Sequence, residues 1–211
     1  MGMRYLGIPY VSSFSMEASI LTFSVIFFSY LLGSIPFGIL VSKVFGLGNL
    51  RDIGSGNIGA TNVLRTGNKL AALITLVLDG LKGALVVVVA RFISEDAAIT
   101  ASICVIIGHI YPVWLRFLGG KGVATFIGAI LALSFVAGSL VCLIWIMIAV
   151  IFRYSSLSAM ISSASAPIWI FLFYGNEALI VTLIMAVLIC YRHKDNIRRL
   201  INGSEARIGK V

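Results

Sequence analysis

Long apolar stretches separated by short polar segments dominate the sequence. A helix needs about 20 mainly apolar residues to cross a hydrocarbon core of about 30 Å. The run at residues 131–150 is almost continuously apolar, whereas membrane-spanning strands alternate apolar and polar residues. The pattern therefore predicts an all-α, polytopic membrane bundle of seven transmembrane helices, at residues 18–45, 69–93, 97–118, 124–136, 137–152, 157–174 and 177–191.

The division of residues 124–152 into two helices rests on length. One continuous helix would be about 43 Å long at about 1.5 Å per residue, which exceeds the hydrocarbon thickness unless it tilts. Ala137-Gly138-Ser139 offers a tight turn. Without that division the chain would have six spans, and both termini would lie on one side of the membrane.

Composition excludes a soluble fold. Apolar residues make up 60% of the 211 residues and charged residues 11%, against about 45–50% and about 25% in soluble domains. We expect one membrane domain at residues 18–203, with an N-terminal extension at 1–17 and a tail at 204–211. The extension lacks the long apolar core of a cleavable signal.

Lysine and arginine collect on one side of the bundle if the N-terminus lies outside. The other side then receives only Arg4 and Arg91, beside four acidic residues. Basic loops stay in the cytoplasm, which predicts the N-terminus outside and the C-terminus inside. The net charge of +8 is explained by basic loops against anionic lipid, so no nucleic-acid partner is expected.

The first polar segment, residues 46–68, is dense in glycine, asparagine and arginine. Glycines let backbone N–H groups turn towards an anion, while hydroxyl, amide and guanidinium groups add hydrogen bonds and charge. A flexible polar loop is the alternative. The segment predicts a phosphate-binding loop, with the candidate ligands Arg51, Gly54, Ser55, Gly56, Asn57, Thr61, Asn62 and Arg65.

A second polar segment, Gly119-Gly120-Lys121-Gly122, precedes a predicted helix. Glycines and a lysine at the positive end of a helix dipole are an arrangement that holds phosphate. It is not the loop of P-loop nucleotidases, because glycine follows Lys121 where that motif needs serine or threonine. A tight turn whose lysine only sets orientation is the alternative.

A third polar segment follows the last apolar stretch, at residues 191–200. In a helix, His193, Asn196 and Leu200 would share one face, flanked by Arg192 and Arg199. A basic tail that only sets membrane orientation is the alternative.

Charged residues also occur inside the apolar stretches. Asp79 and Lys82 lie three residues apart, within reach of each other in a helix. Such groups are costly in a membrane unless they are paired or functional, and both interpretations stay open. His109 is expected to be a hydrogen-bonded core residue, and Pro112 to kink its helix.

Four blocks of sequence together resemble the bacterial acyl-phosphate:glycerol-3-phosphate acyltransferase family. They are GSIPFG at 33–38, SGNIGATN at 55–62, GGKGVAT at 119–125 and HxxNIxRL at 193–200, and the resemblance extends from about residue 20 to residue 203. It implies a seven-helix enzyme of the bacterial inner membrane. This enzyme moves a fatty acyl group from acyl phosphate to the sn-1 hydroxyl of glycerol 3-phosphate, giving lysophosphatidic acid.

The resemblance also implies that the three polar segments form the active site at the cytoplasmic face. Since no Gly-x-Ser-x-Gly elbow is present, we expect direct attack of the glycerol hydroxyl on the acyl-phosphate carbonyl. Either His193 or the substrate phosphate would take the proton. The expected catalytic residues are His193, Asn196, Ser55 and Lys121; Gly119, Gly120, Gly122, Ser158 and Arg199 join the first segment in binding substrate.

Two other classes compete with this interpretation. An anion transporter would also aim helix ends at its substrate, but usually near mid-membrane and between repeats, and no repeat is apparent. A metal-dependent head-group transferase would need several spaced acids, whereas the eight acids are scattered. We therefore expect no metal and no other cofactor, and a monomer surrounded by membrane lipids.

Overall fold

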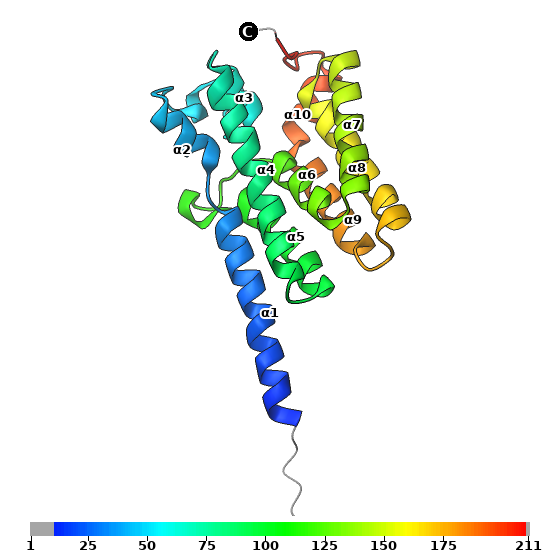
Figure 1. The fold of residues 1–211 in the computed structure, drawn as a ribbon. Helices are drawn as coiled ribbons and strands as arrows, with labels where there is room; N and C mark the ends of the chain where they lie inside the picture. The colour runs from blue at the N-terminus through cyan, green and yellow to red at the C-terminus, as the bar shows by residue number, and fades with distance from the viewer. Residues whose placement is uncertain (1–10, 210–211) are drawn as a thin grey trace, which may run out of the picture.

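The computed structural model describes residues 11–209, and this part of the chain is helical without any strand (Figure 1). The expected all-helical membrane fold is confirmed. Its elements are α1 (Val11–Gly33), α2 (Phe37–Val44), η1 (Leu50–Asp52), α3 (Ala60–Leu64), α4 (Lys69–Arg91), α5 (Glu95–Ile110), η2 (Val113–Leu115), α6 (Val123–Leu133), α7 (Phe135–Phe152), α8 (Ser155–Phe173), α9 (Leu179–Arg192) and α10 (Lys194–Ile201), where η marks a 3₁₀ helix.

Five segments among the described residues are long and apolar enough to cross a membrane. The helices α6 and α9 are also apolar but shorter, with 11 and 14 residues. At about 1.5 Å per residue, α6 extends over only about 16 Å, roughly half of a hydrocarbon core. The five long segments are Ala18–Val44, Lys69–Arg91, Glu95–Leu115, Phe135–Phe152 and Ser155–Phe173.

The first apolar stretch is two helices rather than one. α1 ends at Gly33 and α2 begins at Phe37, because Pro36 lacks an N–H and disfavours helical backbone at Ile35. A Cβ at Gly38 would lie 1.8 Å from the carbonyl oxygen of Ile58. The break therefore allows α2 to pack closely against the segment at 46–68.

The predicted division of residues 124–152 exists, but the turn expected near residues 137–139 lies instead at Ser134. The Ser134 hydroxyl accepts a hydrogen bond from the Ala137 N–H at 3.3 Å and caps α7. Gly138 lies inside α7, where a Cβ would come within 2.5 Å of Leu131. Ser134 thus caps the start of α7, while Gly138 allows α6 and α7 to pack closely together.

The third apolar stretch also ends earlier than expected. α5 stops at Ile110, before Pro112, and is not continued through a kink. Arg116 and Phe117 then adopt left-handed backbone, with φ of 51° and 63°. The chain doubles back, so that the glycine segment at 119–122 returns to the end of α5.

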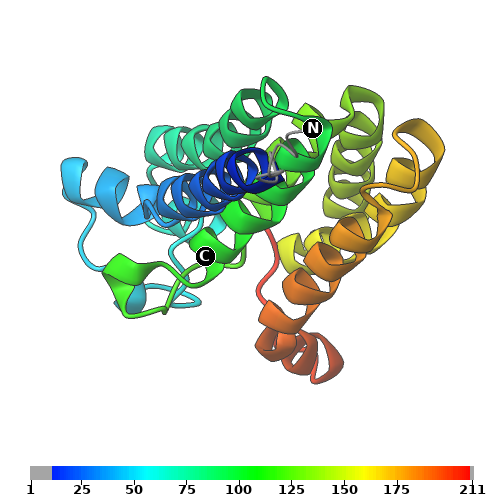
Figure 2. The same cartoon turned by 90° about the horizontal axis from the view of Figure 1, so that it is seen from below.

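The helices form two groups, which meet mainly where α6 packs against α7 and α5 against α9 (Figure 2). One group contains α1, α4, α5 and α6, and the other α7, α8 and α9. Glycines allow close approach in the first group: a Cβ at Gly83 would lie 2.1 Å from the Thr125 carbonyl oxygen, and one at Gly128 2.0 Å from that of Gly80. Small residues at such contacts are typical of membrane helices.

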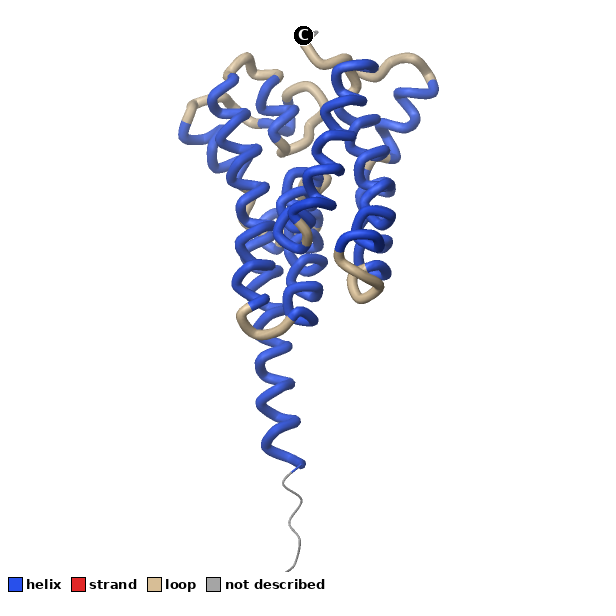
Figure 3. Tube along the Cα trace, turned by 45° about the vertical axis from the view of Figure 1, so that its right-hand side comes forward, coloured by secondary structure: helices blue, strands red, loops and turns tan. Residues whose placement is uncertain are grey.

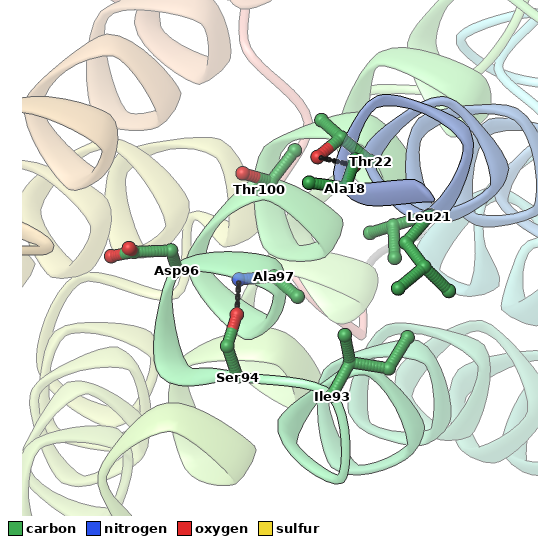
Figure 4. Close-up of a pocket in the computed structure, with 9 residues that line it drawn as sticks. Ala18, Leu21, Thr22, Ile93, Ser94, Asp96, Ala97 and Thr100 are labelled. Atoms are coloured by element: carbon green, nitrogen blue, oxygen red, sulfur yellow. Dashed lines mark hydrogen bonds between the residues drawn. The ribbon is translucent and has the colours of Figure 1, made fainter. Parts of the chain in front are cut away.

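The two ends of the bundle differ. The longer loops gather at the end that also holds α10 and the C-terminus, which we call the polar end (Figure 3). At the opposite end, a pocket of about 320 Å³ lies between α1 and the start of α5 (Figure 4). Two of its hydroxyl groups are engaged by the backbone, since Thr22 donates to the Ala18 carbonyl and Ser94 caps α5. The polar end is therefore the candidate for function.

Candidate active site

The polar end brings the three polar segments of the sequence together. Arg51 of the first segment donates a hydrogen bond to the carbonyl of Leu118, beside the second. Lys121 of the second donates to the side-chain oxygen of Asn196 in the third. Most of the predicted site residues thus belong to one connected region, although they are up to 148 positions apart, from Arg51 to Arg199.

Asn62 organises the first segment from within. Its side-chain N–H groups donate to the carbonyls of Leu50 and Ile53, both at 3.0 Å, and its oxygen accepts from the backbone N–H and the hydroxyl of Ser55 at 3.0 and 3.2 Å. The side chain is 2% exposed. Asn62 therefore fixes the shape of the loop and leaves Ser55 at its exposed surface.

The other polar groups of this segment also contact protein. Asn57 accepts from the Ile58 N–H at 2.9 Å, and the Thr61 hydroxyl lies 3.0 Å from that of Ser155 at the start of α8. Arg51 additionally donates to the Gly56 carbonyl at 3.2 Å. These contacts hold the loop against its neighbours.

Two glycines in this loop are required by its backbone. Gly54 and Gly56 have φ of 52° and 67°, in the left-handed region that favours glycine. A Cβ at Gly54 would also lie 2.6 Å from the side chain of Arg65. Gly54 thus lets the Arg65 side chain lie directly against the loop.

In the second segment, two of the glycine N–H groups are already bonded to protein and are not free to bind an anion. The N–H groups of Gly119 and Gly120 donate to the carbonyls of Ile110 and His109, at 3.0 and 3.1 Å. Gly122 has a φ of 83° and directly precedes α6, whose first turn has no side-chain cap. The positive end of α6, together with Lys121, is what this segment can offer to an anion.

His193 lies at the junction of α9 and α10 and is 2% exposed. Its Nδ1 lies 2.7 Å from the Ile189 carbonyl oxygen. Since a carbonyl only accepts, Nδ1 carries a proton, and Nε2 is the proton-accepting nitrogen of the neutral ring. Asn196 follows on α10 and is 5% exposed, so the predicted shared face of His193 and Asn196 is the buried one.

Glu205 was assigned to the tail by the sequence, but it lies at the centre of a buried network. One carboxylate oxygen accepts from the Ser156 hydroxyl and the Asn196 amide, both at 2.6 Å, and the other accepts from Arg199 at 2.6 Å. The network thereby connects Lys121, through Asn196, to α8 and to the end of α10. Of the α8 serines it includes Ser156, whereas the predicted Ser158 donates to the Tyr154 carbonyl.

Charge at this end is predominantly positive. Arg199 pairs with Glu205, but four basic side chains whose charges act on one another here form no ion pair with a carboxylate of the described residues. Uncompensated cations that meet at one place favour binding of an anion. They are Arg51, Arg65, Lys121 and Arg192.

The surroundings also shift the titration of the central groups. Burial, followed by the charges of Arg199 and Arg65, lowers the pKa of Lys121 to about 8, against the opposing effect of Glu205. Burial and then Lys121 lower the pKa of His193 to about 4. At neutral pH the site therefore contains a charged lysine beside a neutral histidine.

Comparison with known proteins identifies the family of the chain. A sequence model of the family described as Glycerol-3-phosphate acyltransferase matches residues 23–203. A protein of that name from Cereibacter sphaeroides is 56% identical over 182 residues, covering 86% of this chain and 87% of the relative. One from Brucella canis is 49% identical over 183 residues, covering 86% of this chain and 90% of the relative.

Two crystal structures share the fold. Both are of PlsY (YgiH), an integral membrane glycerol 3-phosphate acyltransferase. The glycerol 3-phosphate form matches with a TM-score of 0.85 and 37% identity, covering 89% of this chain and 96% of that one. The lysophosphatidic acid form matches with a TM-score of 0.83 and 35% identity, covering 89% of this chain and 95% of that one. The chain therefore belongs to the glycerol-3-phosphate acyltransferase family, as its four sequence blocks predicted.

Proposed function

We propose that this protein is a membrane acyltransferase that moves a fatty acyl group from acyl phosphate to the sn-1 hydroxyl of glycerol 3-phosphate. The products are lysophosphatidic acid, a phospholipid precursor, and phosphate. The observation that carries the proposal is a group of four basic side chains where the three polar segments meet, none of which forms an ion pair with a carboxylate of the described residues: Arg51, Arg65, Lys121 and Arg192. Both proposed substrates carry phosphate, whose charge would balance this set.

The location of the site suits two substrates of different solubility. Glycerol 3-phosphate is water-soluble, whereas acyl phosphate carries a long apolar chain. A polar end that continues directly into apolar helices can receive the first from water and the second from the bilayer. The basic loops favour the cytoplasmic side for this end, in the inner membrane of a bacterium.

The membrane topology is part of the proposal. We count α6 and α9 as spans together with the five longer segments, which gives seven and places the N-terminus outside and the C-terminus inside. Residues 18–203 form the catalytic domain, between an extension at 1–17 and a tail at 204–211. The protein acts as a monomer among membrane lipids, without a metal or cofactor.

The proposed reaction is a single displacement at the acyl carbonyl. The sn-1 oxygen forms an ester bond to the carbonyl carbon, and the bond from that carbon to the phosphate oxygen breaks. Because the leaving group is phosphate, no enzyme nucleophile is required. Lys121, Asn196 and Ser55 would hold the phosphates and stabilise the developing negative charge.

The hydroxyl proton goes to substrate phosphate rather than to His193. With a pKa of about 4, His193 is a weaker base than a phosphate monoester, whose second pKa is about 6. Its Nε2 can still accept a hydrogen bond from the hydroxyl and orient it. A His193→Gln variant should lose rate but keep the acidic limb of its pH profile near pH 6. Disappearance of that limb would instead identify His193 as the base.

The donor is tested by supplying alternatives separately. Purified protein receives glycerol 3-phosphate with acyl phosphate, acyl-carrier-protein ester or acyl-CoA, and lysophosphatidic acid is measured. Acyl phosphate should give product. Product only from a thioester would refute the proposed donor, and no product from any donor would refute the enzyme. Flux of labelled glycerol 3-phosphate into liposomes without any lipid product would support the transporter alternative.

A further inference from the structure

A cluster of polar side chains lies inside the bundle, apart from the basic side chains of the active site. Asp79 and Lys82 of α4 are each 3% exposed, and their carboxylate oxygen and Nζ are 2.8 Å apart. This confirms that they can pair. Lys82 Nζ also donates to the Ile35 carbonyl at 2.8 Å and lies 5.5 Å from the centre of the Phe37 ring. Lys82 therefore contacts the break between α1 and α2.

His109 and Thr125 extend the cluster towards the glycine segment. His109 Nδ1 lies 3.1 Å from the Thr125 hydroxyl and 3.6 Å from the Asp79 carboxylate. This confirms the expected hydrogen-bonded core histidine. The His109 carbonyl accepts from the Gly120 N–H at 3.1 Å, and a Cβ at Gly120 would lie 2.2 Å from His109 Nε2. The imidazole thus packs directly against the backbone of Gly120.

We propose that these four side chains, Asp79, Lys82, His109 and Thr125, are positioning residues for the active site, and we call them the polar hub. Their contacts end on the two irregular parts of the backbone, the α1–α2 break and the glycine segment that carries Lys121. Through His109, the hub sets the position of Gly120 and hence of Lys121. The α1–α2 break in turn places α2, whose Gly38 packs on the first polar segment.

Mutual neutralisation alone does not explain these contacts. A buried ion pair can often be replaced by apolar residues without loss of stability, so it contributes little as a pair. Backbone carbonyls outside regular helix are costly in lipid unless they accept hydrogen bonds. The Ile35 carbonyl, in the break between α1 and α2, accepts from the Phe37 N–H at 3.1 Å, and Lys82 gives it a second, charged donor. The hub therefore fixes backbone where regular helix cannot. The role in catalysis rests on the proposed function, because it assumes that Lys121 holds a substrate phosphate.

The decisive variant replaces both charges at once. Asp79→Leu/Lys82→Met removes the pair without leaving a single buried charge, and methionine approximates the volume of lysine. We expect monodisperse protein in detergent with a thermal midpoint close to the wild type, and a KM for at least one phosphate substrate raised tenfold or more. Unchanged KM values in folded protein, with or without a lower kcat, would overturn the proposal.

A milder variant decides the matter if the double variant does not fold. Thr125→Val preserves the shape of the side chain but removes the hydroxyl next to His109. It should raise the same KM about threefold to tenfold. Ser102→Ala is the matched control, since it deletes a buried hydroxyl of α5 that donates only to the Ile99 carbonyl of its own helix. Equal KM values for Thr125→Val and the control would overturn the proposal.

Failure of the proposed function would look different. Equilibrium binding of glycerol 3-phosphate to each purified variant reports on the hub without an acyl donor. If the wild type bound glycerol 3-phosphate but used another donor, only the proposed donor would be wrong. If the wild type and the hub variants bound glycerol 3-phosphate equally well, and had the same KM for whichever acyl donor gives product, only the proposed role of the hub would be wrong.

Discussion

Replacing Glu205 with alanine should disable the site although Glu205 touches no proposed substrate group. Three donors, on Ser156, Asn196 and Arg199, each lie 2.6 Å from its carboxylate. Hydrogen bonds to charged groups contribute about 1.5–3 kcal/mol each. The ion pair with Arg199 adds only about 0–1 kcal/mol, because that side chain is 39% exposed. Allowing for overlap between these effects, we expect Glu205→Ala to lower the free energy of unfolding by about 4 kcal/mol.

The effect on activity follows from Asn196. Its amide loses Glu205 while its oxygen still accepts from Lys121, so both side chains can move. A displacement of about 1 Å at an active site can cost roughly 100-fold in rate. We therefore expect kcat/KM of Glu205→Ala to fall about 100-fold, measured as lysophosphatidic acid formed from acyl phosphate and glycerol 3-phosphate.

Controls separate this network from a general effect of losing a glutamate. Glu177→Ala removes an exposed carboxylate at the opposite end and should leave both stability and kcat/KM near the wild type.

Hydrogen bonds from Ser156, Asn196 and Arg199 outweigh burial and lower the pKa of Glu205. Its stabilising effect is then present above its ordinary pKa and is lost as the pH falls through the lowered folded value. Wild-type kcat/KM in Glu205→Ala would refute the reasoning.

Three further predictions address other parts of the site. Because the pKa of Lys121 is about 8, the lysine loses its charge above pH 8, and the KM for a phosphate substrate should rise there about tenfold per pH unit. Lys121→Arg should abolish that rise. A KM of the wild type that does not change with pH would contradict this prediction. Asn62→Ala removes four hydrogen bonds and should lower the free energy of unfolding by about 4 kcal/mol, at about 1 kcal/mol each. Asn57→Ala should lower it by only about 1 kcal/mol. Equal losses of thermal stability in the two variants would refute this difference. Activity should survive dialysis against a chelator, and recovery only on adding a divalent metal would disprove the metal-free site.

The helices were predictable because apolar stretches in a membrane protein are long and few. Their breaks were less predictable, since Ser134 and Gly138 both suggest a turn. Serine offers a side-chain cap, whereas a glycine within a helix can equally serve close packing. The structure uses Ser134 for the first purpose and Gly138 for the second.

The site was predictable where the chemistry is local. Lys121 and Asn196 stand in short motifs, and the structure places them in contact. The sequence did not indicate Glu205 as a site residue, because its hydrogen-bond partners stand elsewhere in the chain, on α10 and on α8. A signal was available at Gly203, whose φ of 68° ends α10. Glycine after a helix turns the chain back, and this brings Glu205 onto Asn196.

Some expected ligands now have a structural explanation as well. Asn62 and Thr61 are engaged by neighbouring protein groups, and the N–H groups of Gly119 and Gly120 donate to the last two carbonyls of α5. Sequence motifs indicate which residues a site needs, but not which of them touch substrate. That assignment depends on three-dimensional contacts between segments that are distant in the chain.

Recognition of phosphate by the basic side chains of the polar end is the central claim. It is tested most directly by equilibrium binding of labelled glycerol 3-phosphate to the purified protein in detergent. We predict saturable binding that inorganic phosphate competes away, that glycerol does not affect, and that Lys121→Met weakens at least tenfold. Binding that glycerol displaces as well as phosphate does, or that Lys121→Met leaves unchanged, would contradict the account.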